Sequence, residues 1–270
     1  MIAVSVIVIN YNTYALTSSC LRSVIEKTHA VTYELILVDN ASSECDPQIF
    51  SQEFPQILLI RNIENIGFAK ANNLGIKAAS GQFVLLLNSD TVLVDDSVSI
   101  LHQQMAARQQ VAIASGKLIS PDGTLQACCQ RFPSFTLFLF EISRIQKLFS
   151  RRRVGKILLG AFFDYESEIY PDWVWGTFMM VKTSLIQKLP EQKLNEDFFM
   201  YCEDIQWCLD FKKLGYRIYY TPLAKVIHLM GGSLADKNTL RTKNFELFIE
   251  NNYTFFKAWL LTRIYCSYYS

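Results

Sequence analysis

The sequence predicts an α/β fold in which a mostly parallel β-sheet is covered by helices on both faces. Apolar runs of strand length alternate with segments whose apolar residues recur at helical spacing, as in repeated βαβ units. The runs are almost uninterrupted, which is typical of parallel strands buried on both faces. Half of the 270 residues are hydrophobic and the net charge is +1. A chain of this length can bury a core, and its charge balance predicts no nucleic-acid partner.

The first half of the chain carries the regular alternation. We expect strands at 4–9, 33–38, 57–60, 83–87 and 111–114, and helices at 16–25, 68–79 and 98–105. The second half is less regular. There we expect a strand at 176–181, a helix at 205–214 and short strands at 216–220 and 225–229. Gly215 follows that helix directly, at a position where glycine often ends a helix.

Cysteine usage and the N-terminal residues predict the compartment. The seven cysteines include no CxxC pair, and an odd number without a framework indicates reduced thiols and a cytoplasmic protein. Met1 leads straight into a strand, without the basic region and cleavage site of a signal peptide. No uncharged apolar run reaches the roughly 18 residues that span a bilayer. We therefore expect a chain that is soluble or peripheral to a membrane.

Polar residues follow three of the expected strands directly. They are Asn10-Tyr11-Asn12, Asp39-Asn40 and Asn88-Ser89-Asp90-Thr91. In open parallel sheets, ligands bind outside the carboxyl ends of the strands. We therefore expect these residues to line one edge of the sheet.

Asp90 is a candidate ligand for Mg²⁺ or Mn²⁺, since Mg²⁺ binds one or two carboxylates together with substrate phosphates. Asn88 is neutral and would be a weaker or more distant ligand. The alternative is that these residues cap the next helix or form an Asx-turn. Asp39 likewise either accepts a hydrogen bond from a nucleotide base or ribose, or forms a turn with Asn40.

Glu203 and Asp204 directly precede an apolar helical pattern that starts at Ile205, so both are expected in the first helical turn. One of them is a candidate general base. The alternative is that they only stabilise the helix, by about 0.3–1 kcal/mol each through its dipole. The dipole lowers the pKa of a carboxyl group, whereas burial and a neighbouring acid raise it.

Two further features are weaker on their own. Gly67 precedes the helix expected at 68–79, and N–H groups at a helix start can hold phosphate oxygens. The alternative for Gly67 is an ordinary turn before a buried helix. His228 lies in an apolar strand, where a histidine is usually a core residue with a hydrogen-bond partner. It becomes a candidate metal ligand if the fold brings it to Asp90.

In this order the pieces resemble the family 2 inverting glycosyltransferases, especially the rhamnosyltransferase-like members that build bacterial surface polysaccharides. The matching stretches are Val4–Asn12, Leu35–Ser42, Asn65–Gly75, Leu85–Thr91, Gly176–Val181, Glu196–Ile205 and His228–Ser233. The resemblance implies a GT-A fold, a Rossmann-like α/β domain, over residues 1–235. Nucleotide-sugar binding would fall in 1–115, the acceptor and catalytic half in 116–235, and a helical tail in 236–270.

The resemblance also implies the chemistry. A sugar such as rhamnose would move, with inversion, from a UDP- or dTDP-sugar to a glycan or polyprenyl-diphosphate-linked acceptor, with a divalent cation (Mg²⁺ or Mn²⁺). Asp204 would be the catalytic base with Glu203 as its partner, and Asp90 and His228 would bind the metal. Trp175 and Gly176 would shape the acceptor side. Carried over residue by residue, the donor-nucleotide contacts are Asn10, Tyr11, Asp39, Gly67, Asn88 and Ser89.

Two positions depart from the family's pattern. The family often has an acid two residues after the Glu-Asp pair and an arginine four residues further on, where this chain has Gln206 and Asp210. These changes leave room for an alternative, a catalytically impaired homologue that acts as a scaffold in polysaccharide assembly. A sugar-phosphate nucleotidyltransferase is disfavoured, since the first strand is followed by Asn10-Tyr11-Asn12 and not by a glycine-rich basic loop.

A basic and aromatic insert occupies residues 132–163. Between Glu141 and Asp164 there are six basic residues and no acidic ones. Basic and aromatic side chains together suit an anionic membrane surface, which predicts peripheral contact with the cytoplasmic face of the inner membrane. The alternative is a packed helix whose arginines at 151–153 form a solvated charge run. Residues 253–269 carry the same two alternatives.

Overall fold

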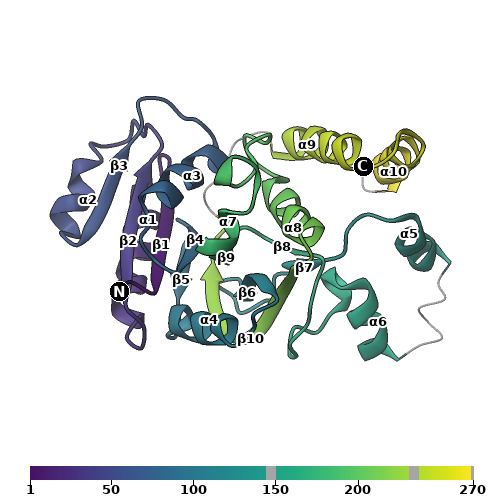
Figure 1. Ribbon diagram of the computed structural model, residues 1–270, viewed down its shortest axis with the longest axis horizontal. Coiled ribbons are helices and arrows are strands. Elements are labelled where there is room, and N and C mark those ends of the chain that lie inside the picture. Colours follow the sequence, from purple (N-terminus) through teal and green to yellow (C-terminus); the bar gives the residue numbers. More distant parts are fainter. Residues whose placement is uncertain (144–149, 231–236, 269–270) are drawn as a thin grey trace.

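The computed structural model describes residues 1–143, 150–230 and 237–268. Within them, one eight-stranded sheet has the order β3-β2-β1-β4-β9-β6-β10-β5 (Figure 1). Its strands are β1 (Val4–Asn10), β2 (Tyr33–Asp39), β3 (Ile57–Arg61), β4 (Phe83–Asn88), β5 (Thr91–Leu93), β6 (Val111–Ile119), β9 (Phe178–Lys182) and β10 (Arg217–His228). Strands β3, β2, β1 and β4 are mutually parallel, as is the pair β6 and β10. The predicted α/β class is confirmed.

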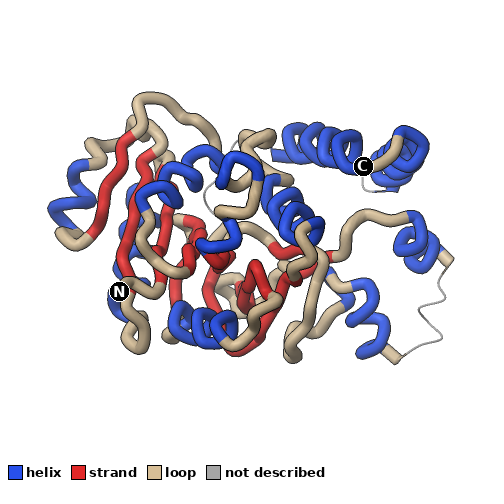
Figure 2. Tube along the Cα trace, viewed as in Figure 1, coloured by secondary structure: helices blue, strands red, loops and turns tan. Residues whose placement is uncertain are grey.

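Helices cover this sheet on both sides (Figure 2). In chain order they are α1 (Tyr14–Lys27), α2 (Gln48–Glu53), α3 (Phe68–Ala78), α4 (Ser97–Ala106), α5 (Phe135–Ile142), α6 (Arg151–Leu158), α7 (Thr183–Ile186), α8 (Glu203–Lys213), α9 (Lys237–Asn252) and α10 (Phe255–Tyr268). The apolar runs form the core because both faces of their strands are covered; in β1, Val6, Ile7 and Val8 are fully buried.

Two strands run against the others, and one of them was not expected. β9 is antiparallel to both β4 and β6, between which it lies. β5 has only three residues and pairs antiparallel with the end of β10, so that His228 lies opposite Thr91. This pairing brings the end of β10 to the residues that follow β4.

Strand β10 corrects the prediction of two separate strands at 216–220 and 225–229. It is one strand, with an irregularity in its register against β6 between Tyr220 and Lys225. Pro222 lies inside that irregular stretch. A proline has no N–H to donate to a strand ladder and is found at bulges and edges, which explains why the sequence indicated a break.

Within its described residues, the basic and aromatic insert contains the helices α5 and α6 and a short 3-10 turn at Gly160–Phe162. α6 buries Val154 and Leu158 and leaves Arg152, Arg153 and Lys156 exposed. This stretch is therefore a packed helix with a charged face open to solvent, and contact of that face with a membrane stays a prediction. The other predicted members Arg144, Ile145, Lys147, Leu148 and Phe149 lie outside the described residues.

The last two helices form a second, smaller core against α8. Phe248 and Ile249 of α9 pack with Leu261 of α10 and with Ile205 of α8. Because Ile205 follows the Glu203-Asp204 pair directly, this core fixes the start of the helix that carries both acids.

Candidate active site

Three polar strand ends lie side by side, as predicted. In the parallel ladders Asn10 pairs with Asp39, and Ile9 pairs with Asn88. We call this the carboxyl edge, meaning the ends of β1, β2 and β4 with Asn10, Asp39 and Asn88. The buried parallel strands place these residues together, because all three strands leave the sheet at the same side.

Asn10 and Asp39 bind each other at the carboxyl edge. The Asn10 amide donates to Asp39 Oδ1 at 2.8 Å, and the Ser42 N–H donates to Asp39 Oδ2 at 3.1 Å. Asp39 is only 1% exposed. The turn interpretation of Asp39 therefore holds, and its contact with a nucleotide stays a prediction, as does that of Tyr11, which lies exposed beside this pair.

Gly67 is a point of close packing. Its N–H donates to Asn65 Oδ1 at 3.0 Å, and the next N–H, of Phe68, donates to the Phe199 carbonyl at 2.7 Å. Gly67 has φ +82°, and a Cβ there would lie 2.5 Å from the Phe199 carbonyl oxygen. These two N–H groups at the start of α3 thus have protein acceptors, and a contact of Gly67 with a donor stays a prediction.

Asp90 and His228 meet, although 138 positions of sequence separate them. His228 Nε2 lies 3.3 Å from Asp90 Oδ1, and both residues are 7% exposed. The Leu229 N–H also donates to the Asp90 carbonyl at 2.8 Å. The other imidazole nitrogen, Nδ1, lies 2.7 Å from Gln126 Oε1. The condition set for His228 as a candidate metal ligand is met, because the β5–β10 pairing brings it to Asp90.

The donor atoms at this point suit a hard divalent cation. Asp90 supplies a carboxylate, the ligand that Mg²⁺ and Mn²⁺ prefer, and His228 supplies an imidazole nitrogen, a ligand of transition metals. Two residues before Asp90, the Oδ1 atom of Asn88 is buried without a hydrogen-bond partner. An unpaired buried amide oxygen is costly, and a cation or a ligand N–H would satisfy it.

Within the described residues, no cluster of three or more histidine, cysteine, aspartate or glutamate side chains is placed to hold a metal ion. A cation held by Asp90 and His228 would take its remaining ligands from water or a phosphate, as Mg²⁺ commonly does. Ser89, between Asn88 and Asp90, lies with its Oγ 3.3 Å from Thr13 Oγ1. Its contact with a donor stays a prediction.

Glu203 and Asp204 are the first two residues of α8, as predicted. The chain enters this helix through two left-handed residues, Tyr201 (φ 69°) and Cys202 (φ 70°). Asn244 of α9 holds this entry by donating from its amide to the Met200 carbonyl at 2.7 Å. Non-glycine residues at positive φ cost energy, so the entry is a constrained feature that surrounding contacts maintain.

The two acids have different partners. Asp204 accepts the Gly176 N–H on Oδ2 at 3.1 Å and the Ile205 N–H on Oδ1 at 2.9 Å. Glu203 Oε2 is buried without a hydrogen-bond partner. Burial, and then the charge of Asp204, raise the pKa of Glu203 well above its usual range.

The pKa of Asp204 is also raised by burial, against the opposing effects of its two N–H donors and of Arg241. Hydrogen bonds to the charged form favour ionisation. The two N–H donors therefore favour the ionised form of Asp204, whereas the buried, unpaired oxygen of Glu203 favours its protonated form.

The acceptor-side residues link this carboxylate to the carboxyl edge. Gly176 donates to Asp204, and the carbonyl of the following residue, Thr177, accepts the Asn88 N–H at 3.0 Å. Trp175 is half-buried, and its backbone N–H donates to the Cys128 carbonyl at 3.1 Å. The end of β4 and the start of α8 thus flank one short segment of chain.

Gln206 and Asp210, which depart from the family's pattern, bind each other. Gln206 donates from Nε2 to Asp210 Oδ1 at 2.7 Å, and its Oε1 accepts the Asn252 amide at 2.7 Å. Together they attach the end of α9 to α8. Burial raises the pKa of Asp210.

Sequence reasoning missed three residues of this site. Gln126 contacts His228, Asn244 holds the entry to α8, and Arg241 acts electrostatically on Asp204. All three come from irregular or late segments of the chain, where neither a strand end nor a family motif marks them. An isolated polar residue in such a segment gives no signal before the fold is known.

Comparison with known proteins shows the family and the fold of this chain. Residues 5–169, more than half of the chain, match the family described as "Glycosyl transferase family 2". Among curated relatives, the N-acetylglucosaminyl-diphospho-decaprenol L-rhamnosyltransferase of Mycobacterium tuberculosis (strain H37Rv) is 27% identical over 206 residues, covering 72% of this chain and 66% of that protein. Rhamnosyltransferase WbbL of Escherichia coli (strain K12) is 24% identical over 205 residues, covering 73% of this chain and 72% of that protein.

A third relative, glycosyltransferase GlyG of Streptococcus pneumoniae, is 28% identical over 105 residues. The chain spans 35% of GlyG and 66% of the mycobacterial protein, less than two thirds of each.

Solved structures show the same fold. The mannosyltransferase PcManGT from Pyrobaculum calidifontis, in complex with GDP-Man and Mn²⁺, has a TM-score of 0.61 at 17% identity, covering 97% of this chain and 69% of that one. GalNAc-T7 with UDP, GalNAc and Mn²⁺ has a TM-score of 0.66 at 12% identity, covering 93% and 48%. At such identities the likeness concerns the fold, and it confirms the GT-A prediction. With the family match, it leads to one conclusion: the chain belongs to glycosyl transferase family 2.

Proposed function

We propose that this chain is a metal-dependent inverting glycosyltransferase that moves a hexose from a nucleotide-diphosphate sugar to an acceptor hydroxyl. One observation carries the proposal. The Asp204 carboxyl group accepts the Gly176 N–H, and the carbonyl of the next residue, Thr177, accepts the Asn88 N–H. Asn88 lies two residues before Asp90, which pairs with His228. A general base and a site for a cation bound to diphosphate are the two features that such a transfer requires.

In this mechanism Asp204 accepts the proton of the acceptor hydroxyl as that oxygen attacks the anomeric carbon. The Gly176 and Ile205 N–H groups orient the carboxylate, and burial raises its pKa, which makes it a stronger base. The bond from the anomeric carbon to the diphosphate breaks as the new glycosidic bond forms, so a single displacement inverts the configuration. A bound Mg²⁺ or Mn²⁺ would offset the negative charge of the leaving diphosphate.

The donor would lie along the carboxyl edge. We assign its contacts to Asn10, Tyr11, Asp39, Gly67, Asn88 and Ser89. The unpaired Oδ1 of Asn88 supports this position, since a ligand at this edge would satisfy it. UDP and dTDP are the two candidate nucleotides. Rhamnose is the sugar we propose, because two of the relatives are named as rhamnosyltransferases.

The acceptor would approach past Trp175 and Gly176. We propose a glycan on a polyprenyl diphosphate, because one relative is named for an N-acetylglucosaminyl-diphospho-decaprenol substrate. The scaffold alternative rested on Gln206 and Asp210. Gln206 bonds to both Asp210 and Asn252, so these two departures have a structural explanation in the attachment of α9 to α8.

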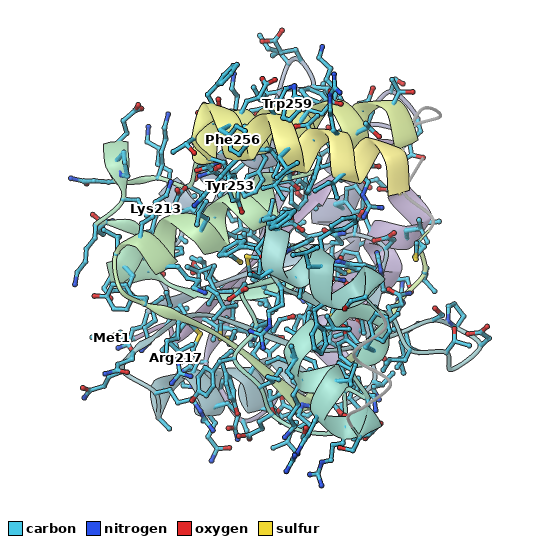
Figure 3. The ribbon with its side chains drawn as sticks, turned by 90° about the vertical axis from the view of Figure 1, so that its right-hand side faces the viewer. Met1, Lys213, Arg217, Tyr253, Phe256 and Trp259 are labelled. Atoms are coloured by element: carbon cyan, nitrogen blue, oxygen red, sulfur yellow. The ribbon has the colours of Figure 1, made fainter. Side chains whose placement is uncertain are left out.

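An acceptor of this kind requires access to a lipid surface, and one face of the molecule suits it. We call it the aromatic-basic face, formed by exposed residues of α5, α6, the turn after α6, and α10. Its apolar members are Phe135, Leu139, Ile157, Phe162, Phe255, Phe256 and Trp259, and its basic members are Arg152, Arg153, Lys156 and Arg263. Figure 3 looks onto this side, with Phe256 and Trp259 labelled on α10.

The exposures on α10 are unusual for a water-facing helix. Phe255 is 89% exposed, Phe256 70% and Trp259 48%, while Ala258 and Leu261 face the core. The Arg263 guanidinium lies 4.7 Å from the centre of the Trp259 ring. Aromatic rings beside cations suit the headgroup region of an anionic bilayer. We propose peripheral contact of this face with the cytoplasmic surface of the inner membrane.

The aromatic-basic face would contact the membrane surface without crossing the bilayer. None of the helices within 1–143, 150–230 and 237–268 combines the length and apolar character needed to cross a bilayer. The Tyr253 hydroxyl, beside α10, donates to the Pro133 carbonyl at 2.8 Å, which holds α10 close to the segment that leads into α5. This hydrogen bond therefore connects the α10 part of the aromatic-basic face to the α5 part.

A donor panel tests the proposed function. UDP- and dTDP-sugars are assayed for nucleotide release with a polyprenyl-diphosphate-linked acceptor, with Mn²⁺ or Mg²⁺ and with EDTA. We expect one donor to give metal-dependent release, and NMR of the product to show the inverted anomer. Release that EDTA leaves unchanged would contradict metal dependence, and a retained anomer would contradict the single displacement.

A further inference from the structure

One buried glutamine connects three groups around His228. Gln126 is 6% exposed and lies between the 121–123 turn and the strand β7 (Cys129–Gln130). Its Nε2 donates to the His228 carbonyl at 3.0 Å and to Ser120 Oγ at 3.0 Å. Its Oε1 lies 2.7 Å from His228 Nδ1. The Gln126 backbone N–H also donates to the Leu118 carbonyl at 3.0 Å, which fixes the residue against the end of β6.

These contacts determine which way the amide points. The atom beside the His228 carbonyl must be the NH₂ group, because two carbonyl oxygens at 3.0 Å would repel each other. The amide oxygen therefore faces Nδ1, and an amide oxygen can only accept a hydrogen bond. It follows that Nδ1 of His228 carries a hydrogen.

The position of this hydrogen determines the state of the other ring nitrogen, Nε2. In the neutral ring with hydrogen on Nδ1, the lone pair of Nε2 is free to bind a metal. Nε2 is the atom that lies 3.3 Å from Asp90 Oδ1. A lone pair and a carboxylate oxygen that face each other across this distance repel unless a proton or a metal cation lies between them.

We propose that Gln126 is the positioning residue that selects the tautomer of His228 and aims its Nε2 at a divalent cation shared with Asp90. The inference rests on the cation site of the proposed function and adds to it a residue that does not touch the cation. Hydrogen-bonded partners of metal-binding histidines fix ring orientation, and their loss typically weakens metal affinity by about 10–100-fold.

The competing interpretation is that Gln126 only ties its segment to β10. Gln130 provides a matched control, since it is also a glutamine of the same segment and donates to the Ala127 carbonyl at 2.8 Å. Gln126→Met and Gln130→Met each replace the amide by an apolar chain of similar length. A role restricted to stability would lower the melting temperature without changing the tautomer of His228.

The test is NMR of protein labelled with ¹⁵N-histidine. The chain has three histidines, so the imidazole signals are few. The signals that disappear in His228→Asn are those of His228. Spectra are recorded at about pH 9, and in a neutral imidazole ring the nitrogen that carries hydrogen and the nitrogen that does not give distinguishable signals. We expect the hydrogen on Nδ1 in the wild type and in Gln130→Met, and a mixture of both tautomers in Gln126→Met.

Titration with Mn²⁺ alone supplies the second reading, at a pH near 7.5 where the ion stays in solution. Paramagnetic broadening of the His228 signals should require about tenfold more Mn²⁺, or more, in Gln126→Met than in Gln130→Met. Should Gln126→Met fail to fold, Ser120→Ala removes one acceptor of the amide and should shift the tautomer ratio in the same direction.

Two outcomes separate this inference from the proposed function. A hydrogen on Nε2 in the wild type, or a tautomer unchanged in both Gln126→Met and Ser120→Ala, would overturn the inference even if Mn²⁺ binds. A tautomer that depends on Gln126, with no Mn²⁺ broadening in any protein, would instead overturn the cation site of the proposed function.

Discussion

Glu203 and Asp204 are neighbours in the chain whose carboxyl groups have different surroundings. Asp204 has two N–H donors, whereas Glu203 Oε2 is buried without a partner and the pKa of Glu203 is raised. A buried carboxyl group with a raised pKa keeps its proton in the folded state and releases it on unfolding. Its contribution to stability is therefore complete below the ordinary glutamate pKa of 4.5 and is lost as pH rises toward the folded value.

This direction of the pH dependence leads to a prediction for Glu203→Gln, which keeps the shape of the side chain and removes its titratable proton. Between about pH 5 and 8 the wild type should lose up to about 1.4 kcal/mol of unfolding free energy per pH unit through this group. The variant should lack that slope and be more stable than the wild type at pH 8. Chemical unfolding at several pH values measures it, with the exposed Glu64→Gln as control. Parallel pH profiles of wild type and Glu203→Gln would contradict the buried, protonated state.

Single residues also show how far the sequence predicts this site. Asp90 and Asp204 were predictable because one follows a buried strand and the other begins an amphipathic helix. His228 needed the resemblance, since its meeting with Asp90 depends on β5, a strand of three residues that is too short to give a sequence pattern. Gln126 could not be predicted, because its importance depends on a contact across 102 positions of sequence.

At the scale of elements, the start of α3 and the entry to α8 depend on each other. The Phe199 carbonyl accepts the first N–H of α3, and Gly67 leaves the room for it. Gly123 has almost the same φ, +83°, but a Cβ there would meet nothing within 4 Å. The two glycines therefore separate the cost of the backbone conformation from the cost of the contact.

We expect Gly123→Ala to lower the free energy of unfolding by about 1–2 kcal/mol, the cost of a left-handed alanine. Gly67→Ala should cost about 1–3 kcal/mol more, because the new methyl group overlaps the Phe199 carbonyl. It should also speed hydrogen exchange in residues 196–202, as that segment moves away. Equal losses in the two variants would show that the packing between α3 and the α8 entry is not tight.

Element prediction succeeded where periodicity was strong. The long parallel strands and the helices α1, α3, α4 and α8 follow from continuous apolar runs and helical spacing. The short α2, α7, β5, β7 and β8 (Trp173–Val174) were missed, because two to six residues carry too little pattern. The sequence pattern predicts two strands where the structure has the single strand β10. Pro222 lies in the middle of β10, where the register against β6 is irregular.

At the scale of the whole molecule, the aromatic-basic face lies at the end of the fold away from β3 (Figure 1). Burying an exposed phenylalanine in a bilayer contributes about 1.5–3 kcal/mol, and each basic residue near an anionic surface about 1 kcal/mol. On these figures, the exposed residues of α10 and α6 would account for the proposed reversible binding without a membrane span.

We expect the protein to bind phosphatidylcholine vesicles that contain phosphatidylglycerol, and to bind them more weakly as salt increases. The double variant Phe255→Ser and Trp259→Ser should bind at least about tenfold more weakly. Ile63→Ser is the matched control, because Ile63 is fully exposed and follows β3 at the opposite end. Vesicle flotation measures each. Binding that neither salt nor the double variant reduces would contradict this use of the face.

The central claim is that Asp204 is the base of a glycosyl transfer whose donor lies at the Asp90–His228 side of the same site. Asp204→Asn keeps the shape of the side chain and one acceptor oxygen, for either the Gly176 or the Ile205 N–H, but it cannot accept the proton. Loss of a general base typically lowers kcat by about 10²–10⁴-fold. Asp164→Asn, at an exposed position, is the matched control.

The decisive measurement is kcat for the active donor beside the dissociation constant of the same donor, in Asp204→Asn, Asp164→Asn and the wild type. We predict that Asp204→Asn loses at least about 100-fold in kcat while its donor dissociation constant changes by less than about threefold. Asp164→Asn should match the wild type in both. Wild-type turnover in Asp204→Asn, or a loss of turnover explained by lost donor binding, would contradict Asp204 as the base.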